Sequence, residues 1–81
     1  MEQEPKRVQV RIYGKAELGL MYHPYAVSDT TARHWLMREI SYVPGLMDKL
    51  YATGYRKKAR TFTPCQVKLI FEALGEPIPQ T

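Results

Sequence analysis

Within the segment Lys6–Tyr13, polar and hydrophobic residues alternate from Arg7 to Ile12. A period of two places Val8, Val10 and Ile12 on one side of an extended chain and the intervening polar residues on the other. The β-branched residues strengthen this pattern, and Gly14 ends it. The sequence therefore predicts one N-terminal β-strand with a buried face.

The next hydrophobic residues recur at helical spacing. Lys15–Tyr22 predicts a short helix in which Leu18, Met21 and Tyr22 share an inner face, and Gly19 weakens it. The His-Pro pair that follows ends this helix, because the residue before a proline is pushed away from helical angles.

A longer amphipathic helix is predicted over Thr30–Val43, with Ser28 or Asp29 as its N-cap. Its inner face is aliphatic and is flanked by Trp35, which we assign to the core. The inner residues are Ala32, Leu36, Ile40 and Val43. The opposite arc is mostly polar and carries Thr30, Arg33, His34, Met37, Arg38 and Ser41.

Two further helices complete the pattern. Pro44–Thr53 predicts a third helix, with the proline in its first turn and a stop at Gly54. The last helix is expected to begin with Thr63 as N-cap and Pro64 in the first turn, and to end at Gly75. The inward positions are Leu46, Met47 and Leu50 in the third helix and Val67, Ile70, Phe71 and Leu74 in the last.

This order predicts a small, mainly α domain (small α+β) of helix-turn-helix or winged-helix character, with one N-terminal strand and a basic wing or loop. A chain of 81 residues has room for a single core. We expect the domain to span residues 6–75, between a disordered N-terminus at residues 1–5 and a C-terminal tail at residues 76–81.

Charge changes this picture because it is segregated. The net charge is +4 at pH 7, yet no acidic residue occurs between Asp48 and Glu72. The basic residues of that stretch are Lys49, Arg56, Lys57, Lys58, Arg60 and Lys68. The densest run lies between two predicted helices, with Tyr55 and Phe62 expected to anchor it on the core. Clustered cations on a loop are typical of a nucleic-acid contact, although a solvated loop has the same pattern.

Helix-turn-helix geometry would present the helix that begins at Thr30 to the major groove of DNA. Arg33, His34 and Arg38 would then enter the groove, with Thr30 and Thr31 at its edge. Further phosphates would be neutralised by the cations of the loop, Arg56, Lys57, Lys58 and Arg60. We therefore expect a DNA-binding protein whose partner is double-stranded DNA. The choice between DNA and RNA and the oligomeric state, a homodimer included, stay open.

Catalytic chemistry has little support in the sequence. There is no glycine-rich phosphate loop, no nucleophile motif and no close pair of carboxylates on one face. Cys65, His23 and His34 are too few and too far apart for a zinc ligand set. We expect no enzyme activity, no cofactor, no metal and no small-molecule substrate. A lone cysteine without an export signal or a membrane-length segment predicts a cytoplasmic protein with no membrane partner.

Motifs between Tyr13 and Pro77 carry a resemblance to a known family. They are Tyr13-Gly-Lys-Ala-Glu-Leu18, Tyr22-His-Pro24, Ala32-Arg-His-Trp-Leu36, Leu50 to Gly54-Tyr55, Phe62-Thr-Pro-Cys-Gln-Val67, Ile70 and Leu74-Gly-Glu-Pro77. On these residues the chain resembles small, uncharacterised proteins of Bacteroidetes that form a domain of unknown function (DUF4248-like). This resemblance implies no particular activity.

A looser resemblance is to winged-helix regulators of the MerR and excisionase type. The residues that carry it are Lys15-Ala-Glu-Leu18, Ser28 with Thr31-Ala-Arg33, and Arg60-Thr-Phe-Thr63 with Val67. The chain departs from that pattern by an extra helical segment at residues 44–53, and by a longer connection in place of a tight Gly-Val-Ser turn. The resemblance implies a transcriptional regulator or an excisionase-like accessory factor.

A protein–protein interaction module is the alternative. The strand Val8–Ile12 would then pair edge to edge with another chain, and the basic loop would meet an acidic partner. Leu20 and Met37 fall away from the inner faces of their helices, and their exposure would suit this alternative.

Overall fold

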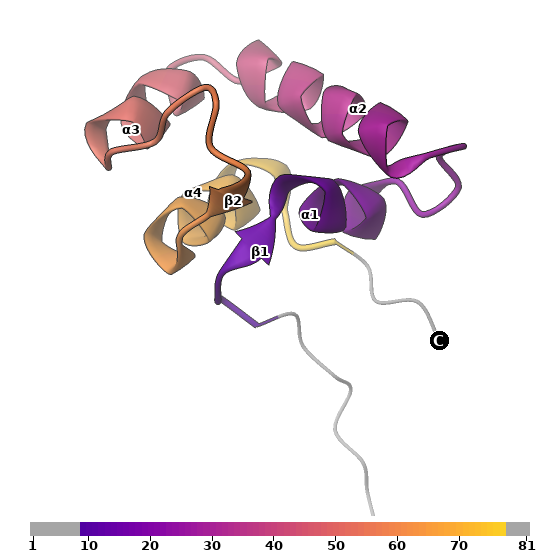
Figure 1. Cartoon of the computed structure of the whole chain (residues 1–81). Helices are drawn as coiled ribbons and strands as arrows, with labels where there is room; N and C mark the ends of the chain where they lie inside the picture. Colours follow the sequence, from indigo (N-terminus) through magenta and orange to yellow (C-terminus); the bar gives the residue numbers. More distant parts are fainter. Residues whose placement is uncertain (1–8, 78–81) are drawn as a thin grey trace, which may run out of the picture.

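The computed structural model describes residues 9–77. Within them the chain forms four helices and two short strands (Figure 1). In chain order these are β1 (Tyr13–Gly14), α1 (Lys15–Tyr22), α2 (Asp29–Tyr42), α3 (Leu46–Ala52), β2 (Thr61–Phe62) and α4 (Pro64–Leu74). The fold is therefore mainly helical, a small α+β arrangement, as the sequence predicted.

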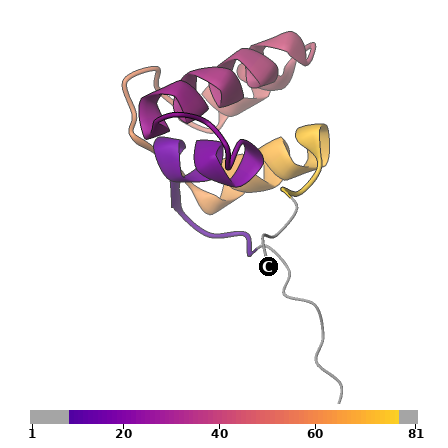
Figure 2. The ribbon, with the colours of Figure 1, turned by 90° about the vertical axis from the view of Figure 1, so that its right-hand side faces the viewer.

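The helices form two layers. Figures 1 and 2 show α2 and α3 on one side and α1 and α4 on the other. The two strands pair antiparallel, with Tyr13 opposite Phe62 and Gly14 opposite Thr61. This short sheet joins the start of α1 to the start of α4, and so closes one end of the helical layers.

A single cluster of buried residues fills the space between the layers, and every helix contributes to it. Its members are Tyr13, Leu18, Leu36, Ile40, Leu46, Leu50, Tyr55, Phe62, Val67, Ile70 and Phe71. The Tyr55 and Phe62 rings stack with their centroids 5.6 Å apart, and Tyr13 packs against Phe71 at 6.4 Å. The predicted inner faces of all four helices are therefore confirmed in the main.

Local capping explains why the helices begin where they do. The bounds of α1 match the prediction, and α2 lies one residue earlier than predicted at each end. Ser28 is the N-cap of α2, since its Oγ accepts a hydrogen bond from the Thr31 amide at 3.1 Å. Thr63 caps α4 through a capping box with Gln66. The Gln66 side chain is buried and also donates to Thr53 Oγ1 at 3.0 Å, which connects α4 to the end of α3.

The predicted strand Lys6–Tyr13 is wrong in its length and in its buried face. Val10 and Ile12 are 50% and 58% exposed, whereas Tyr13 is only 2% exposed. Val8, like the rest of residues 6–8, lies outside the described residues. The physical reason is the partner strand: β2 has two residues, so residues before Tyr13 have no neighbour to pair with.

Residues 9–12 instead bend over the Tyr13 ring. The Tyr13 hydroxyl donates to the Gln9 carbonyl at 2.8 Å, and the Arg11 guanidinium lies 3.8 Å from the ring centroid. Arg11 also pairs with Glu17 at 3.0 Å. These local contacts hold residues 9–12 in place of the hydrogen bonds that a longer β-strand would make.

The predicted start of the third helix at Pro44 is also wrong. Gly45, not Pro44, precedes the first helical residue, and its φ of 81° lies in the left-handed region. A residue in that conformation cannot continue a helix, so Pro44 and Gly45 form the turn between α2 and α3. The helix ends with Thr53 as C-cap, immediately before Gly54, as predicted.

Two apolar residues of α2 lie elsewhere than predicted. Trp35 is 40% exposed rather than part of the core, and its ring packs in a T-shaped arrangement with the His23 ring, with the centroids 5.3 Å apart. Met37 is partly buried against the core rather than exposed, and the Tyr55 hydroxyl lies 4.0 Å from its sulfur. Leu20 is 37% exposed.

The two helices α1 and α2 touch through their backbones at Gly19. A Cβ atom placed on Gly19 would lie 2.7 Å from both the carbonyl carbon and the oxygen of Ala32. Real Cβ atoms essentially never approach backbone so closely, so only glycine fits here. The residue that weakens α1 by propensity is therefore the residue that lets it pack.

We expect Gly19→Ala to lower the free energy of unfolding by about 2 kcal/mol. The clash with the Ala32 backbone costs about 1–3 kcal/mol or more, and it exceeds the gain in helix propensity of about 1 kcal/mol. Urea unfolding monitored by circular dichroism measures the difference. Gly14→Ala is the matched control, because a Cβ there meets its nearest atom at an ordinary 3.7 Å. Equal stability of Gly19→Ala and the parent would contradict the close crossing.

The end of α1 is tied to the end of α4. The Tyr22 hydroxyl donates a hydrogen bond to the Gly75 carbonyl. Burial, together with the negative charges of Glu39 and Glu76, raises the pKa of the Tyr22 phenol above its ordinary value. The folded state therefore retains this proton at a pH where the unfolded chain has lost it.

Stability should consequently fall as the pH rises past about 10, the ordinary pKa of tyrosine. Below that pH the phenol is neutral in both states, and its contribution is fully present. We expect Tyr22→Phe to lose about 1 kcal/mol at neutral pH with the hydrogen bond, and to decline less steeply between pH 9 and 11. Urea midpoints across this range test it. Tyr25→Phe, at an 89% exposed position, should follow the parent.

Candidate nucleic-acid interface

The basic segment forms a tight turn that stands on a buried aromatic base. The Ala59 amide donates to the Arg56 carbonyl at 2.9 Å, which leaves Arg56, Lys57 and Lys58 exposed at the turn. Tyr55, at the foot of the turn, is only 4% exposed and stacks on Phe62. The predicted anchoring of this segment by two aromatic residues is confirmed.

Lys15 holds the turn in place from below. Its side chain is buried, with the residue 5% exposed, and its Nζ donates to the Lys57 carbonyl at 3.0 Å. The Lys15 amide also donates to the Arg60 carbonyl at 2.8 Å. The ammonium group lies 4.7 Å from the centroid of the Tyr55 ring, a favourable cation–π position.

The charge of Lys15 is unusual because its partners are a carbonyl and an aromatic ring. Burial lowers the pKa of the Lys15 amine, and the neighbouring Arg33 guanidinium lowers it further. Lys15 is a site residue that the sequence pattern did not indicate. The only signal was its place at the start of a helix, which gives no indication of a partner 42 residues further along the chain.

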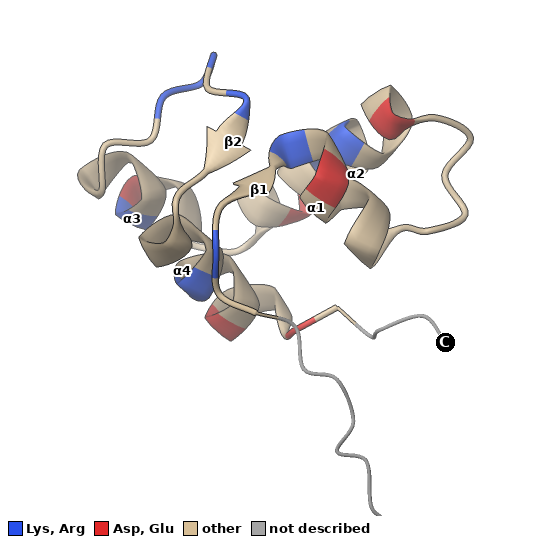
Figure 3. Ribbon diagram, turned by 60° about the horizontal axis from the view of Figure 1, so that its bottom comes forward, with Lys and Arg blue, Asp and Glu red and all other residues tan. Residues whose placement is uncertain are grey.

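A hollow of about 310 Å³ lies where α1, the start of α2 and the basic segment meet. It is lined by Lys15, Ala16, Asp29, Thr30, Arg33 and Arg60. The structure thus brings together three predicted site residues, Thr30, Arg33 and Arg60, and adds Lys15. Figure 3 shows basic positions of α1, α2 and the segment leading into β2 along one side of the molecule.

The other predicted residues lie around this hollow or away from it. Arg56, Lys57 and Lys58 occupy the turn that leads to Arg60, and they do not line the hollow. His34 and Arg38 are exposed on the outer surface of α2. Thr31 belongs to the helix cap, where its hydroxyl accepts a hydrogen bond from Ser28 Oγ at 3.1 Å.

Carboxylates do not neutralise the hollow. Within residues 9–77 the ion pairs closer than 4.0 Å are Arg11–Glu17 and His23–Glu39. The first occupies Glu17 on α1, and the second joins the end of α1 to α2. Lys15, Arg33 and Arg60 form no such pair with a described residue, and Asp29 is the single acid in the lining. The lining of the hollow therefore carries a net positive charge.

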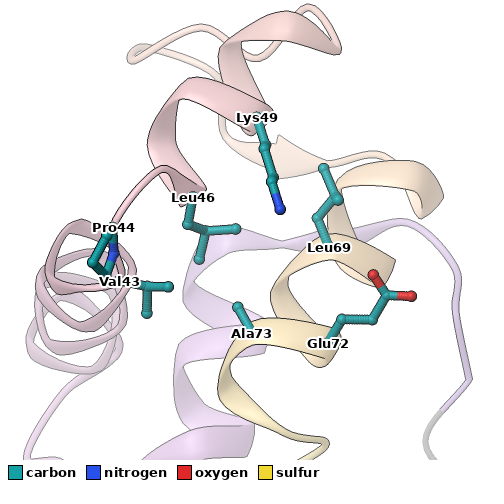
Figure 4. Close-up of a pocket in the computed structure, with 7 residues that line it drawn as sticks. All are labelled: Val43, Pro44, Leu46, Lys49, Leu69, Glu72 and Ala73. Atoms are coloured by element: carbon teal, nitrogen blue, oxygen red, sulfur yellow. The ribbon is translucent and has the colours of Figure 1, made fainter.

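A second hollow, of about 240 Å³, lies between α4 and the corner that joins α2 to α3. Its lining is Val43, Pro44, Leu46, Lys49, Leu69, Glu72 and Ala73. Figure 4 shows Lys49 reaching in between Leu46 and Leu69, with the Glu72 carboxylate beside Leu69. Its one cation and one anion make it electrically balanced, and its other residues are apolar.

The described part of the chain holds no cluster of metal-ligating side chains, since no three His, Cys, Asp or Glu residues come together in it. Cys65 is exposed at the start of α4. Among residues 9–77 no helix has both the length and the apolar character needed to cross a membrane.

The structure thus defines a small, mainly helical α+β domain with a cationic hollow and an adjoining basic turn. Residues 9–77 match the family described as "Domain of unknown function (DUF4248)", and the chain belongs to this family. The predicted membership of a domain-of-unknown-function family is confirmed. No curated protein and no solved structure matches the chain.

We expect Lys15→Met to loosen the basic turn while the domain stays folded. Methionine keeps the apolar stem but removes the donor to the Lys57 carbonyl, a hydrogen bond worth about 1 kcal/mol. Heteronuclear ¹⁵N relaxation should report greater motion on the picosecond to nanosecond timescale at residues 56–59. Lys68→Met, at an exposed position of α4, is the matched control. An unchanged turn in Lys15→Met would contradict the anchoring role of Lys15.

Proposed function

We propose that this protein is a non-enzymatic DNA-binding protein, a transcriptional regulator or an excisionase-like accessory factor. One observation carries the proposal: cations from three separate segments, Lys15, Arg33 and Arg60, converge on one hollow, and none of them forms an ion pair with a carboxylate of residues 9–77. Uncompensated clusters of cations are favoured where a polyanion binds, because phosphate contacts release condensed counterions.

Duplex DNA would lie across the start of α2 and the basic turn. Lys57 and Lys58 are exposed and would neutralise backbone phosphates, which gives affinity without sequence preference. His34 and Arg38 are exposed on the outer surface of α2, where they would reach base edges in the major groove. The short β1–β2 pair and the basic turn that leads into β2 would serve as a wing beside this helix.

The test is fluorescence anisotropy of a labelled random duplex at roughly 50 and 200 mM salt. We expect binding by the parent that weakens steeply with salt. Lys57→Glu combined with Lys58→Glu should weaken binding to all sequences and reduce the slope of log K against log salt by about 2, one for each lost phosphate contact.

The matched control is Lys49→Glu combined with Lys68→Glu, which makes the same change in net charge on α3 and α4. Equal losses in the two double variants would mean that only net charge matters, and would reject the basic turn as a contact surface. Absence of binding by the folded parent at the lower salt concentration would reject the DNA-binding function itself.

A protein-interaction module remains the second candidate because of the connection between α1 and α2. Tyr25 and Val27 are 89% and 92% exposed there, and exposed apolar groups of this size suit a protein contact. If the folded parent fails to bind duplex DNA, the protein-interaction module becomes the favoured function. In that case the first substitutions to make are Tyr25→Ser and Val27→Ser.

A further inference from the structure

The hollow beside the start of α2 has the composition of a site for one anionic group. We propose that it binds a single phosphate group, a phosphodiester of the nucleic-acid backbone, with Arg33 and Arg60 as the direct ligands and Thr30 as a hydroxyl donor. This inference deepens the proposed DNA-binding function and rests on it. It also changes the expected role of Arg33, from a reader of bases in the groove to a phosphate contact.

The size of the hollow suits such a group. Its volume of about 310 Å³ lies at the lower end of the range found for small-ligand sites, about 300–1,000 Å³. A phosphodiester with its neighbouring sugar atoms and a few ordered waters would fit. Four of its six lining residues are ionisable, which favours a charged group over an apolar ligand.

The arrangement of charge favours a phosphate over a neutral ligand. Arg33 comes from α2 and Arg60 from the residue just before β2, so two guanidinium groups on different segments border one space. Guanidinium groups bind phosphate oxygens through paired hydrogen bonds. Lys15 lies in the lining with a buried side chain and adds positive charge from α1.

The buried lysine supports the same conclusion. Lysine is almost never fully buried unless it is paired, and among residues 9–77 the partners of Lys15 are the Lys57 carbonyl and aromatic faces. Burial and the nearby Arg33 both work against its charged form, as the lowered pKa of the amine indicates. An anion in the hollow would oppose both effects. Without one, the site holds more positive charge than its surroundings compensate.

Asp29 provides the sharpest means of testing the site. It lies in the first turn of α2, where its negative charge is favourable to the helix, and it also lines the hollow. A phosphate would be repelled by this carboxylate. Asp29→Asn should therefore tighten phosphate binding about two- to fivefold, a gain that damage to the fold would not produce.

The experiment titrates the ¹⁵N-labelled protein with inorganic phosphate at constant ionic strength, and in parallel titrates it with the labelled random duplex. Saturable shifts of the amides of Thr30, Arg33 and Arg60 are expected with phosphate. Arg33→Gln and Arg60→Gln should each weaken binding to all duplex sequences alike and lower the salt slope by about 1. Lys68→Gln is the charge-matched control, because Lys68 does not line the hollow.

The outcomes separate this inference from the proposed function. In one outcome the duplex binds, and charge reversal at Lys57 and Lys58 weakens that binding. If the variants of the hollow, Arg33→Gln, Arg60→Gln and Asp29→Asn, then behave like Lys68→Gln, the phosphate site is overturned and DNA binding stands. If Arg33→Gln alters sequence preference, Arg33 reads bases and the assignment of its role is overturned. If the duplex fails to bind but inorganic phosphate saturates the site and Asp29→Asn tightens it, the nucleic-acid source is overturned in favour of free phosphate.

Discussion

The rest of the structure depends on the crossing of α1 and α2 at Gly19. Because no side chain separates the two backbones there, α1 lies directly against the Ala32 turn of α2. That contact fixes how α1 lies against α2, and α1 continues without a break from β1. The position of Lys15, and through it the position of the basic turn, therefore follows from a contact one helical turn further along α1. The close packing of α1 against α2 in this way determines where the charged groups of the basic turn lie.

The electrostatic character of the site has the same origin. Lys15 enters the interior because the stacked rings of Tyr55 and Phe62 offer it aromatic faces, with the nearer centroid at 4.7 Å. Aromatic faces stabilise a cation without cancelling its charge, whereas a carboxylate would do both. The hollow consequently keeps the charge of all three cations, with Asp29 as the only opposing group in its lining.

Features that depend on neighbouring residues could be predicted from the sequence, and features that depend on distant partners could not. The bounds of α1 and the capping of α4 by Thr63 are local, and both were predicted correctly. The prediction of the N-terminal strand was wrong because alternation of polar and hydrophobic residues shows only which residues could share a face. Whether they are buried depends on β2, which is two residues long. The predicted burial of Trp35 was wrong for the same reason, since helical periodicity cannot show which flank of a helix is covered by other elements. Arg33 and Arg60 were chosen from charge alone, and their meeting with Lys15 required the fold.

The two hydrogen bonds from Lys15 to the basic segment have a consequence for the thermodynamics of recognition. The turn is closed at its foot by the stacked rings, at Lys57 by the side chain of Lys15 and at Arg60 by its backbone. Its backbone loses its conformational freedom when the domain folds, so a ligand that binds it has little left to order. Flexible basic tails bear that entropy loss at the moment of binding. This segment is preorganised, and its spacing of cations is a fixed property of the fold.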